Sequence, residues 1–71
     1  QLLVAIGQVA EQAGDDQEAL SWYERAVNEG ITDPNFWMNL AQLFARNGQQ
    51  DAAREAIQVA QNYVAQADGT S

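Results

Sequence analysis

The sequence predicts an all-α fold built from two helix-turn-helix hairpins. Apolar residues recur at spacings of three and four, a glycine follows each of the first three predicted helices, and the second half of the chain repeats the first. No segment alternates with the period of two that is typical of a half-buried strand. Because one hairpin is too small to bury its apolar side alone, we expect the two hairpins to stack as a short solenoid.

The first hairpin is predicted from its helix stop and start signals. A helix covers about 2–13, and Gly14 can end it because glycine adopts the left-handed conformation without steric cost. Asp15 supplies an N-cap for the next helix, and Glu18 three residues later completes a capping box. This second helix continues to about Glu29, where the next residue is glycine.

The second hairpin follows a linker at 31–33 that ends in Asp33-Pro34, a cap followed by the residue that is best tolerated in a first turn. Its helices are predicted over about 34–47 and 50–67, separated by a glycine turn. Residues 68–71 are expected to form a frayed tail.

The internal repeat has a period of 34 residues. The shift superimposes identical residues at Gln8/Gln42, Gly14/Gly48, Ala19/Ala53, Ala26/Ala60 and Asn28/Asn62. It also places the apolar residues Leu2, Leu3, Ile6, Val9 and Ala10 on Phe36, Trp37, Leu40, Leu43 and Phe44. The apolar pattern is stronger evidence than the identities, since it predicts that corresponding positions are buried in both copies.

The composition disfavours several classes of partner. Ten acidic residues against three arginines give a formal charge of −7, which repels phosphate backbones and anionic lipid. No apolar run approaches the roughly 20 residues that span a bilayer, and no signal peptide is evident. The chain opens at Gln1 rather than at methionine, so we expect it to be part of a longer protein. The sequence leaves the compartment open between cytoplasm and periplasm.

The residues for catalysis are missing from the sequence. Histidine, lysine and cysteine are absent, so neither a histidine nor a lysine can activate a hydroxyl and no thiolate can hold a metal. The acidic cluster Asp15, Asp16 and Glu18 lies at a helix N-terminus, where negative charge offsets the helix dipole. We therefore predict no enzyme activity, no catalytic residues, no metal site and no cofactor.

The repeat resembles the tetratricopeptide repeat, whose signature is W-x2-L-G-x2-Y followed by A-x3-F and later Ala and Pro. The second copy matches at Trp37, Leu40, Ala41, Phe44, Gly48, Ala53, Ile57 and Ala60. The first copy matches at Leu3, Ile6, Gly7, Ala10, Gly14, Ala19, Tyr23 and Ala26, although Leu3 and Ala10 replace aromatic residues, and neither copy has the closing proline. The resemblance implies a right-handed solenoid, a single domain over 1–67 with repeats at about 1–33 and 34–67, and a scaffold that binds other proteins.

The repeat also predicts how the helices pack. Gly7 or Ala41 allows the close approach of the two helices in a hairpin, while the large side chains Tyr23, Trp37 and Phe44 are expected to fill the space between hairpins. In the predicted stack, Leu20 and Val27 meet Phe36 and Leu43. One period later, Leu20 and Val27 become Arg54 and Gln61, so the last helix is predicted to be a polar C-terminal cap.

The resemblance implies a concave peptide-binding face on the first helix of each hairpin. Its predicted residues are Val4, Gln8, Glu11, Gln12, Asn35, Met38, Asn39, Gln42 and Arg46. The carboxylate clamp of some family members is disfavoured because Val4 and Gln8 stand where lysine and asparagine are expected. The predicted partner is therefore a peptide segment or helix of another protein that lacks strong acidity.

Two alternatives remain. Leu2 and Val9, together with Trp22, form a candidate face for self-association, either as a homodimer through the first helix or as the contact for a missing repeat. The stretch 28–34 also resembles a pentatricopeptide repeat, a family that binds RNA. That alternative is remote, because the charge has the wrong sign and the period is one residue short.

Overall fold

The computed structural model describes residues 2–67, which form four α-helices and no strand. The helices are α1 (Leu2–Gln12), α2 (Asp16–Asn28), α3 (Pro34–Arg46) and α4 (Gln50–Ala67). The all-α prediction is confirmed, and the predicted helices agree with the observed ones to within one residue at their C-terminal ends. Gln1 and the predicted tail at 68–71 lie outside the described residues.

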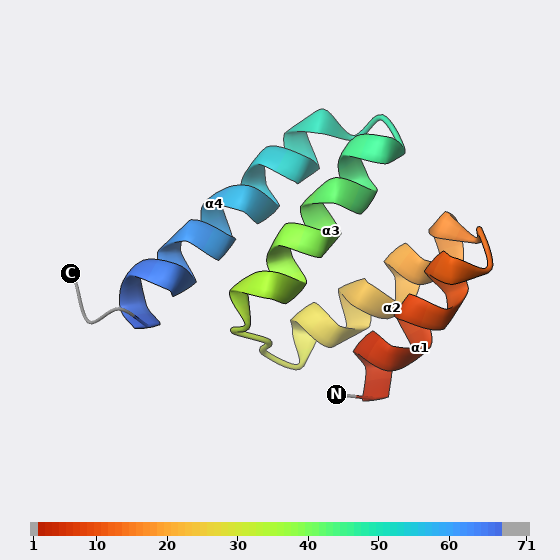
Figure 1. Cartoon of the computed structure of the whole chain (residues 1–71), viewed down its shortest axis with the longest axis horizontal. Helices are drawn as coiled ribbons and strands as arrows, with labels where there is room; N and C mark the ends of the chain where they lie inside the picture. The colour runs from red at the N-terminus through yellow and green to blue at the C-terminus, as the bar shows by residue number, and fades with distance from the viewer. Residues whose placement is uncertain (1, 68–71) are drawn as a thin grey trace. The chain divides into compact units, whose positions relative to one another are not determined.

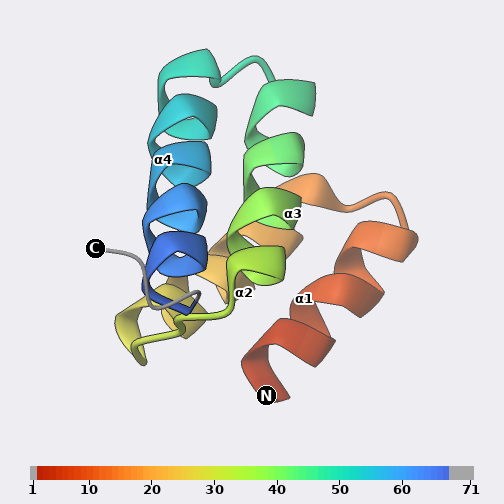
Figure 2. The same ribbon diagram turned by 60° about the vertical axis from the view of Figure 1, so that its left-hand side comes forward.

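The chain divides into two compact units, Gln1–Ile31 and Thr32–Ser71. Each unit holds one hairpin: α1 runs antiparallel to α2, and α3 runs antiparallel to α4, as both ribbon views show (Figures 1 and 2). The units are hairpin one and hairpin two below, and each is described by itself.

The turn inside each hairpin is made by the same backbone hydrogen bonds. In hairpin one, Gly14 N donates to Glu11 O (3.0 Å) and Asp15 N donates to Ala10 O (2.9 Å). The equivalent bonds in hairpin two are Gly48 N to Ala45 O (3.1 Å) and Gln49 N to Phe44 O (2.9 Å). Both glycines have positive φ, +84° and +80°, which completes the helix-ending motif in which an αL residue satisfies the last carbonyls. The sequence repeat is therefore also a repeat of backbone geometry.

Two aspartates cap helix starts as predicted. The Asp15 carboxylate accepts the backbone N–H of Glu18 at 3.3 Å, at the start of α2. The Asp33 carboxylate accepts the backbone N–H of Asn35 at 3.0 Å, and Pro34 occupies the first turn of α3. Each carboxylate satisfies a backbone donor that has no partner within its own helix.

The core of hairpin one is built around a ring that lies on a glycine. Gly7 of α1 lies against the fully buried Tyr23 of α2, and a Cβ atom built on Gly7 would stand 2.5 Å from Cε1 of that ring. The Tyr23 hydroxyl donates a hydrogen bond to Oε1 of Glu11 at 2.8 Å. This contact places the ring between α1 and α2, with its polar end satisfied by α1.

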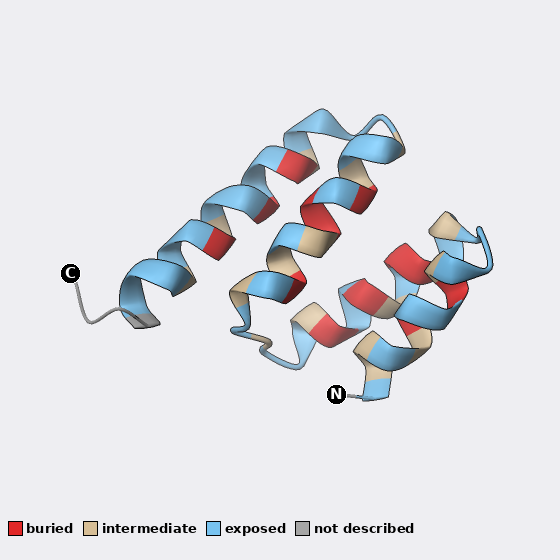
Figure 3. Ribbon diagram, viewed as in Figure 1, coloured by how far each residue is buried: buried red, intermediate tan, exposed pale blue. Residues whose placement is uncertain are grey.

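The core of hairpin two combines large residues from α3 with alanines from α4. Figure 3 shows the buried positions of both helices in red. Its buried residues are Phe36, Leu40, Ala41, Leu43, Ala53, Ala56 and Ala60. At the open end of the hairpin, the Trp37 ring lies 5.6 Å from Phe36 in a T-shaped arrangement and 6.3 Å from Tyr63, measured between ring centroids. These rings form the aromatic cluster, Phe36, Trp37 and Tyr63, which closes the end where α3 begins.

Candidate functional site

The predicted binding face has one half on α1. Gln8 and Gln12 are exposed, whereas Val4 and Glu11 are half-buried. Glu11 has a structural role that the sequence analysis missed, because it accepts the Tyr23 hydroxyl. The sequence contains a signal for this role. A buried tyrosine needs a hydrogen-bond partner, and Glu11 is a carboxylate on the helix that faces Tyr23.

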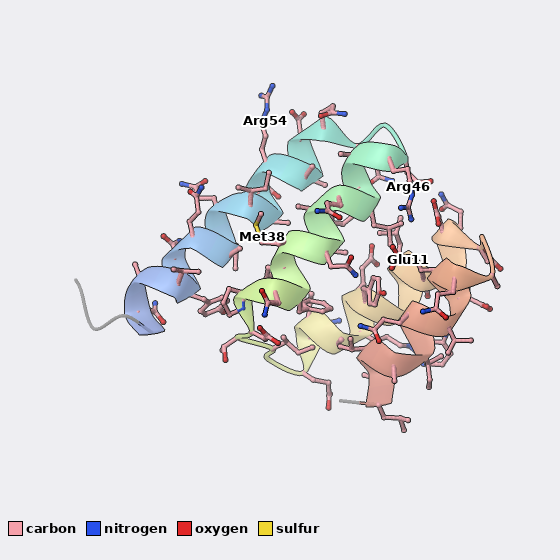
Figure 4. All side chains as sticks on the ribbon, viewed as in Figure 1. Glu11, Met38, Arg46 and Arg54 are labelled. Atoms are coloured by element: carbon pink, nitrogen blue, oxygen red, sulfur yellow. The ribbon has the colours of Figure 1, made fainter. Side chains whose placement is uncertain are left out.

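The other half of the predicted face lies on α3, whose polar side chains surround one apolar one. Asn35, Gln42 and Arg46 are exposed, Asn39 is half-buried, and Met38 is 43% exposed between them. These residues recur at spacings of three and four and therefore share one side of the helix. Figure 4 shows Met38 and Arg46 on this helix.

The side chains of these faces are suited to recognition through hydrogen bonds and apolar contact. Amide side chains both donate and accept hydrogen bonds, and methionine adapts its shape to apolar partners. Within residues 2–67, no group of three or more acidic, histidine or cysteine side chains is arranged to hold a metal ion. Over the same residues, no helix combines the length and apolar character needed to cross a bilayer.

The candidate self-association face contains the most exposed large apolar residues of α1. Leu2 is 74% exposed and Val9 is 67% exposed. Their repeat counterparts in hairpin two, Phe36 and Leu43, are buried. Equivalent positions of the repeat therefore stand in different environments.

Trp22 of this face is half-buried, and a charged neighbour lies against it. The Arg25 guanidinium lies 5.1 Å from the centre of the Trp22 ring, in a cation–π contact across one turn of α2. The repeat counterpart of Trp22 is Ala56, which is buried.

An open hollow that the sequence analysis did not anticipate lies at the end of hairpin one where α1 begins and α2 ends. It has a volume of about 610 Å³ and is lined by Leu2, Leu3, Arg25, Asn28 and Glu29. Two leucines provide apolar surface, and the other three side chains provide a guanidinium, an amide and a carboxylate. This composition is typical of ligand sites, which combine apolar surface with a few polar groups.

The α4 helix carries the predicted polar cap residues on its surface. Arg54 and Gln61 are exposed, and Arg54 projects outward from the helix in Figure 4. Ile57 is 36% exposed and Val64 is 46% exposed, so the exposed surface of this helix is not wholly polar. The predictions that α4 ends the array and that Leu20 and Val27 meet α3 remain predictions.

Comparison with known families agrees with the repeated hairpin geometry. Models of the tetratricopeptide repeat match residues 1–43 and 34–63. The chain belongs to the tetratricopeptide-repeat family. The resemblance inferred from the sequence is thereby confirmed, and the two matches together extend over both hairpins. No curated protein and no solved structure matches this chain significantly.

Tetratricopeptide repeats are generally protein–protein interaction modules, built on a non-catalytic repeat scaffold. For a tetratricopeptide hairpin, the departures from the repeat pattern are informative. They include Glu11, the exposed Leu2 and Val9, and the hollow between the ends of α1 and α2. These features belong to hairpin one. In hairpin two, Ala45 stands at the position of Glu11, and the counterparts of Leu2 and Val9 are the buried Phe36 and Leu43.

Proposed function

We propose that this chain is a non-enzymatic binding module that holds a peptide segment or a helix of a partner protein. The first helix of each hairpin supplies the binding residues: Val4, Gln8, Glu11, Gln12, Asn35, Met38, Asn39, Gln42 and Arg46. The observation that carries the proposal is the face of α3, where the 43%-exposed Met38 lies among exposed amides.

The side-chain chemistry supports a peptide ligand. An extended peptide presents unpaired backbone N–H and C=O groups, and the amides of Gln8 and Gln42 can pair with both kinds. These glutamines occupy the same position in the two repeats. Met38 offers adaptable apolar surface for a side chain of the ligand. The chain provides few positive side chains for an acidic ligand, since it contains three arginines and no lysine.

A peptide-display selection against the full chain tests this proposal. Selected peptides are expected to lose at least tenfold in affinity when Met38 is replaced by glutamate, because the charge removes apolar contact and repels acceptor groups. Val64→Glu is the matched control, since Val64 is 46% exposed and lies on the second helix of its hairpin. Equal effects of the two substitutions, or no selected peptide at all, would contradict the proposal.

Self-association is a second candidate function, and the exposure of Leu2 and Val9 favours it. An apolar stripe of this kind is typical of protein contact surfaces. Light scattering across micromolar concentrations checks it: a mass that rises with concentration and returns to the monomer value in Val9→Glu would support a homodimer through α1.

A further inference from the structure

The hollow in hairpin one occupies the position where hairpin two holds its aromatic cluster. With the period of 34 residues, Leu2, Leu3 and Glu29 correspond to Phe36, Trp37 and Tyr63. In hairpin two these positions hold three aromatic side chains in contact. In hairpin one, the same three positions line an open hollow of about 610 Å³. Hairpin two therefore indicates that aromatic side chains can pack at this end of the repeat. In hairpin one, no side chain of the described residues fills the same position.

The lining of the hollow suits one aromatic side chain with a polar tip. Leu2 and Leu3 offer apolar contact for a ring. The Arg25 guanidinium, which already lies over the Trp22 ring, can also lie against the face of an aromatic ligand. Glu29 and Asn28 provide oxygen acceptors for an indole N–H, which is a donor only.

The charge of hairpin one indicates what should surround that aromatic residue. Residues 2–31 contain six acidic side chains and one arginine, so their formal charge is −5. Residues 32–67 contain three acidic side chains and two arginines, which gives −1. The negative charge is therefore concentrated on the hairpin with the hollow. Lysine or arginine residues are attracted there, whereas a second copy of this chain, with its charge of −7, has to overcome charge repulsion to associate.

We infer that the hollow between the ends of α1 and α2 is a docking site for a tryptophan of a partner protein, on a segment whose neighbouring residues are basic. The inference rests on the proposed protein-binding role and adds a second contact surface, distinct from the amide face of α3. The tryptophan ring lies against Leu2 and Leu3, its indole N–H donates to Glu29 or Asn28, and the flanking basic residues pair with the acidic surface of hairpin one.

Titration of the full chain with a synthetic peptide tests the inference. The probe is an amidated peptide of about 15 residues, some 22 Å long as a helix, with one central tryptophan between lysines. Two matched peptides replace the tryptophan by alanine or the lysines by glutamates. We expect at least tenfold weaker binding for both matched peptides, and the amide NMR signals of Leu3, Asn28 and Glu29 should shift with the tryptophan peptide.

Two sets of variants show whether the hollow is the site. Leu3→Trp with Glu29→Tyr copies the Trp37–Tyr63 pair of hairpin two into hairpin one. This variant is designed to fill the hollow and should abolish binding while keeping the helical circular dichroism. Glu29→Gln should weaken binding severalfold. Glu24→Gln changes an exposed acid of α2 that does not line the hollow and should weaken binding less.

Three results would overturn the inference. They are equal affinity for the tryptophan and alanine peptides, unchanged binding in the filled variant, and a concentration-dependent dimer that the filled variant disrupts, since the last would make a second copy the occupant. Peptides that lose affinity in Met38→Glu but not in the filled variant would leave the proposed function standing and remove only this site.

Discussion

The two hairpins share one backbone plan but fill the space between their helices differently. In hairpin one, the Tyr23 ring lies on Gly7, and its hydroxyl reaches Glu11. The equivalent positions in hairpin two are Ala41, Ile57 and Ala45, which cannot make that arrangement. Ile57 is 36% exposed where Tyr23 is fully buried. The 34-residue period therefore repeats the backbone, whereas the packing is set separately in each copy by a matched group of side chains.

At the open ends of the hairpins the difference is reversed, because hairpin two carries the larger side chains there. Hairpin two has its aromatic cluster at the end where α3 begins. Hairpin one has the hollow at the equivalent end, where α1 begins. Hairpin one thus buries the Tyr23 ring in mid-hairpin, and hairpin two has the aromatic cluster at its open end. The following substitutions separate these two ways of packing the same repeat.

The largest difference in the effect of a substitution on stability is expected between Leu43 and Val9, which are repeat counterparts. Leu43→Ala should lower the free energy of unfolding by about 3 kcal/mol, because it leaves a cavity at a fully buried position. Val9→Ala should change it by no more than about 0.5 kcal/mol, because Val9 is 67% exposed. Urea denaturation followed by circular dichroism measures both. A similar loss for both variants would show that Val9 is covered in solution.

Gly7→Ala should destabilise hairpin one by about 1–3 kcal/mol, as overpacking commonly does. The new methyl group would stand 2.5 Å from the Tyr23 ring, and this clash should exceed the gain of about 1 kcal/mol in helix propensity. Adding Tyr23→Ile, which copies the pair in hairpin two, should recover part of the loss. Hydrogen exchange of the α1 and α2 amides locates the effect, and a neutral Gly7→Ala variant would mean that the ring moves aside freely.

Tyr23→Phe should cost about 1 kcal/mol, because it removes the 2.8 Å hydrogen bond to Glu11 and keeps the ring. Tyr63→Phe is the matched control in hairpin two and should change the free energy of unfolding by about 0.5 kcal/mol or less, since Tyr63 is half-exposed. Thermal unfolding of the two variants side by side gives the comparison. Equal losses would indicate that the bond to Glu11 contributes little.

Effects of about 1 kcal/mol or less are expected at the helix caps. Asp15 caps α2, and Gln49 holds the equivalent position before α4. Asp15→Ala should lower the free energy of unfolding by about 1 kcal/mol, and Gln49→Asp should raise it by about 0.5–1 kcal/mol, because a carboxylate satisfies backbone donors of the first turn. Urea midpoints measure both changes. A destabilising Gln49→Asp would show that the start of α4 needs a different cap.

The helices and turns could be predicted from the sequence because their causes are local. Gly14 and Gly48 end helices through their own φ angles, and Asp15 and Asp33 cap helices through bonds to residues two or three positions away. Such contacts depend only on neighbouring residues. The family resemblance was also readable, because its small and large residues recur at fixed spacings.

The packing between helices was less predictable because it depends on shape in three dimensions. The contacts of Tyr23 with Gly7 and of Trp37 with Tyr63, each inside one hairpin, were not expected from the sequence. That these rings also fill the space between hairpins remains a prediction. The hollow exists because the side chains of Leu3 and Glu29 are not large enough to fill it. A sequence pattern shows which residues are present but not which volumes they leave empty. The predicted face on α1 and α3 needs a bound ligand for its test.

The pairing of α1 with α2 and of α3 with α4 has a consequence for how the chain folds. Each hairpin closes its core between helices joined by a turn of only three residues, so little chain entropy is lost in bringing the partners together. Chains dominated by such nearby contacts fold in microseconds to milliseconds. All the residues of the first helix pair precede Pro34, so this pair can form while the rest of the chain is still being synthesised.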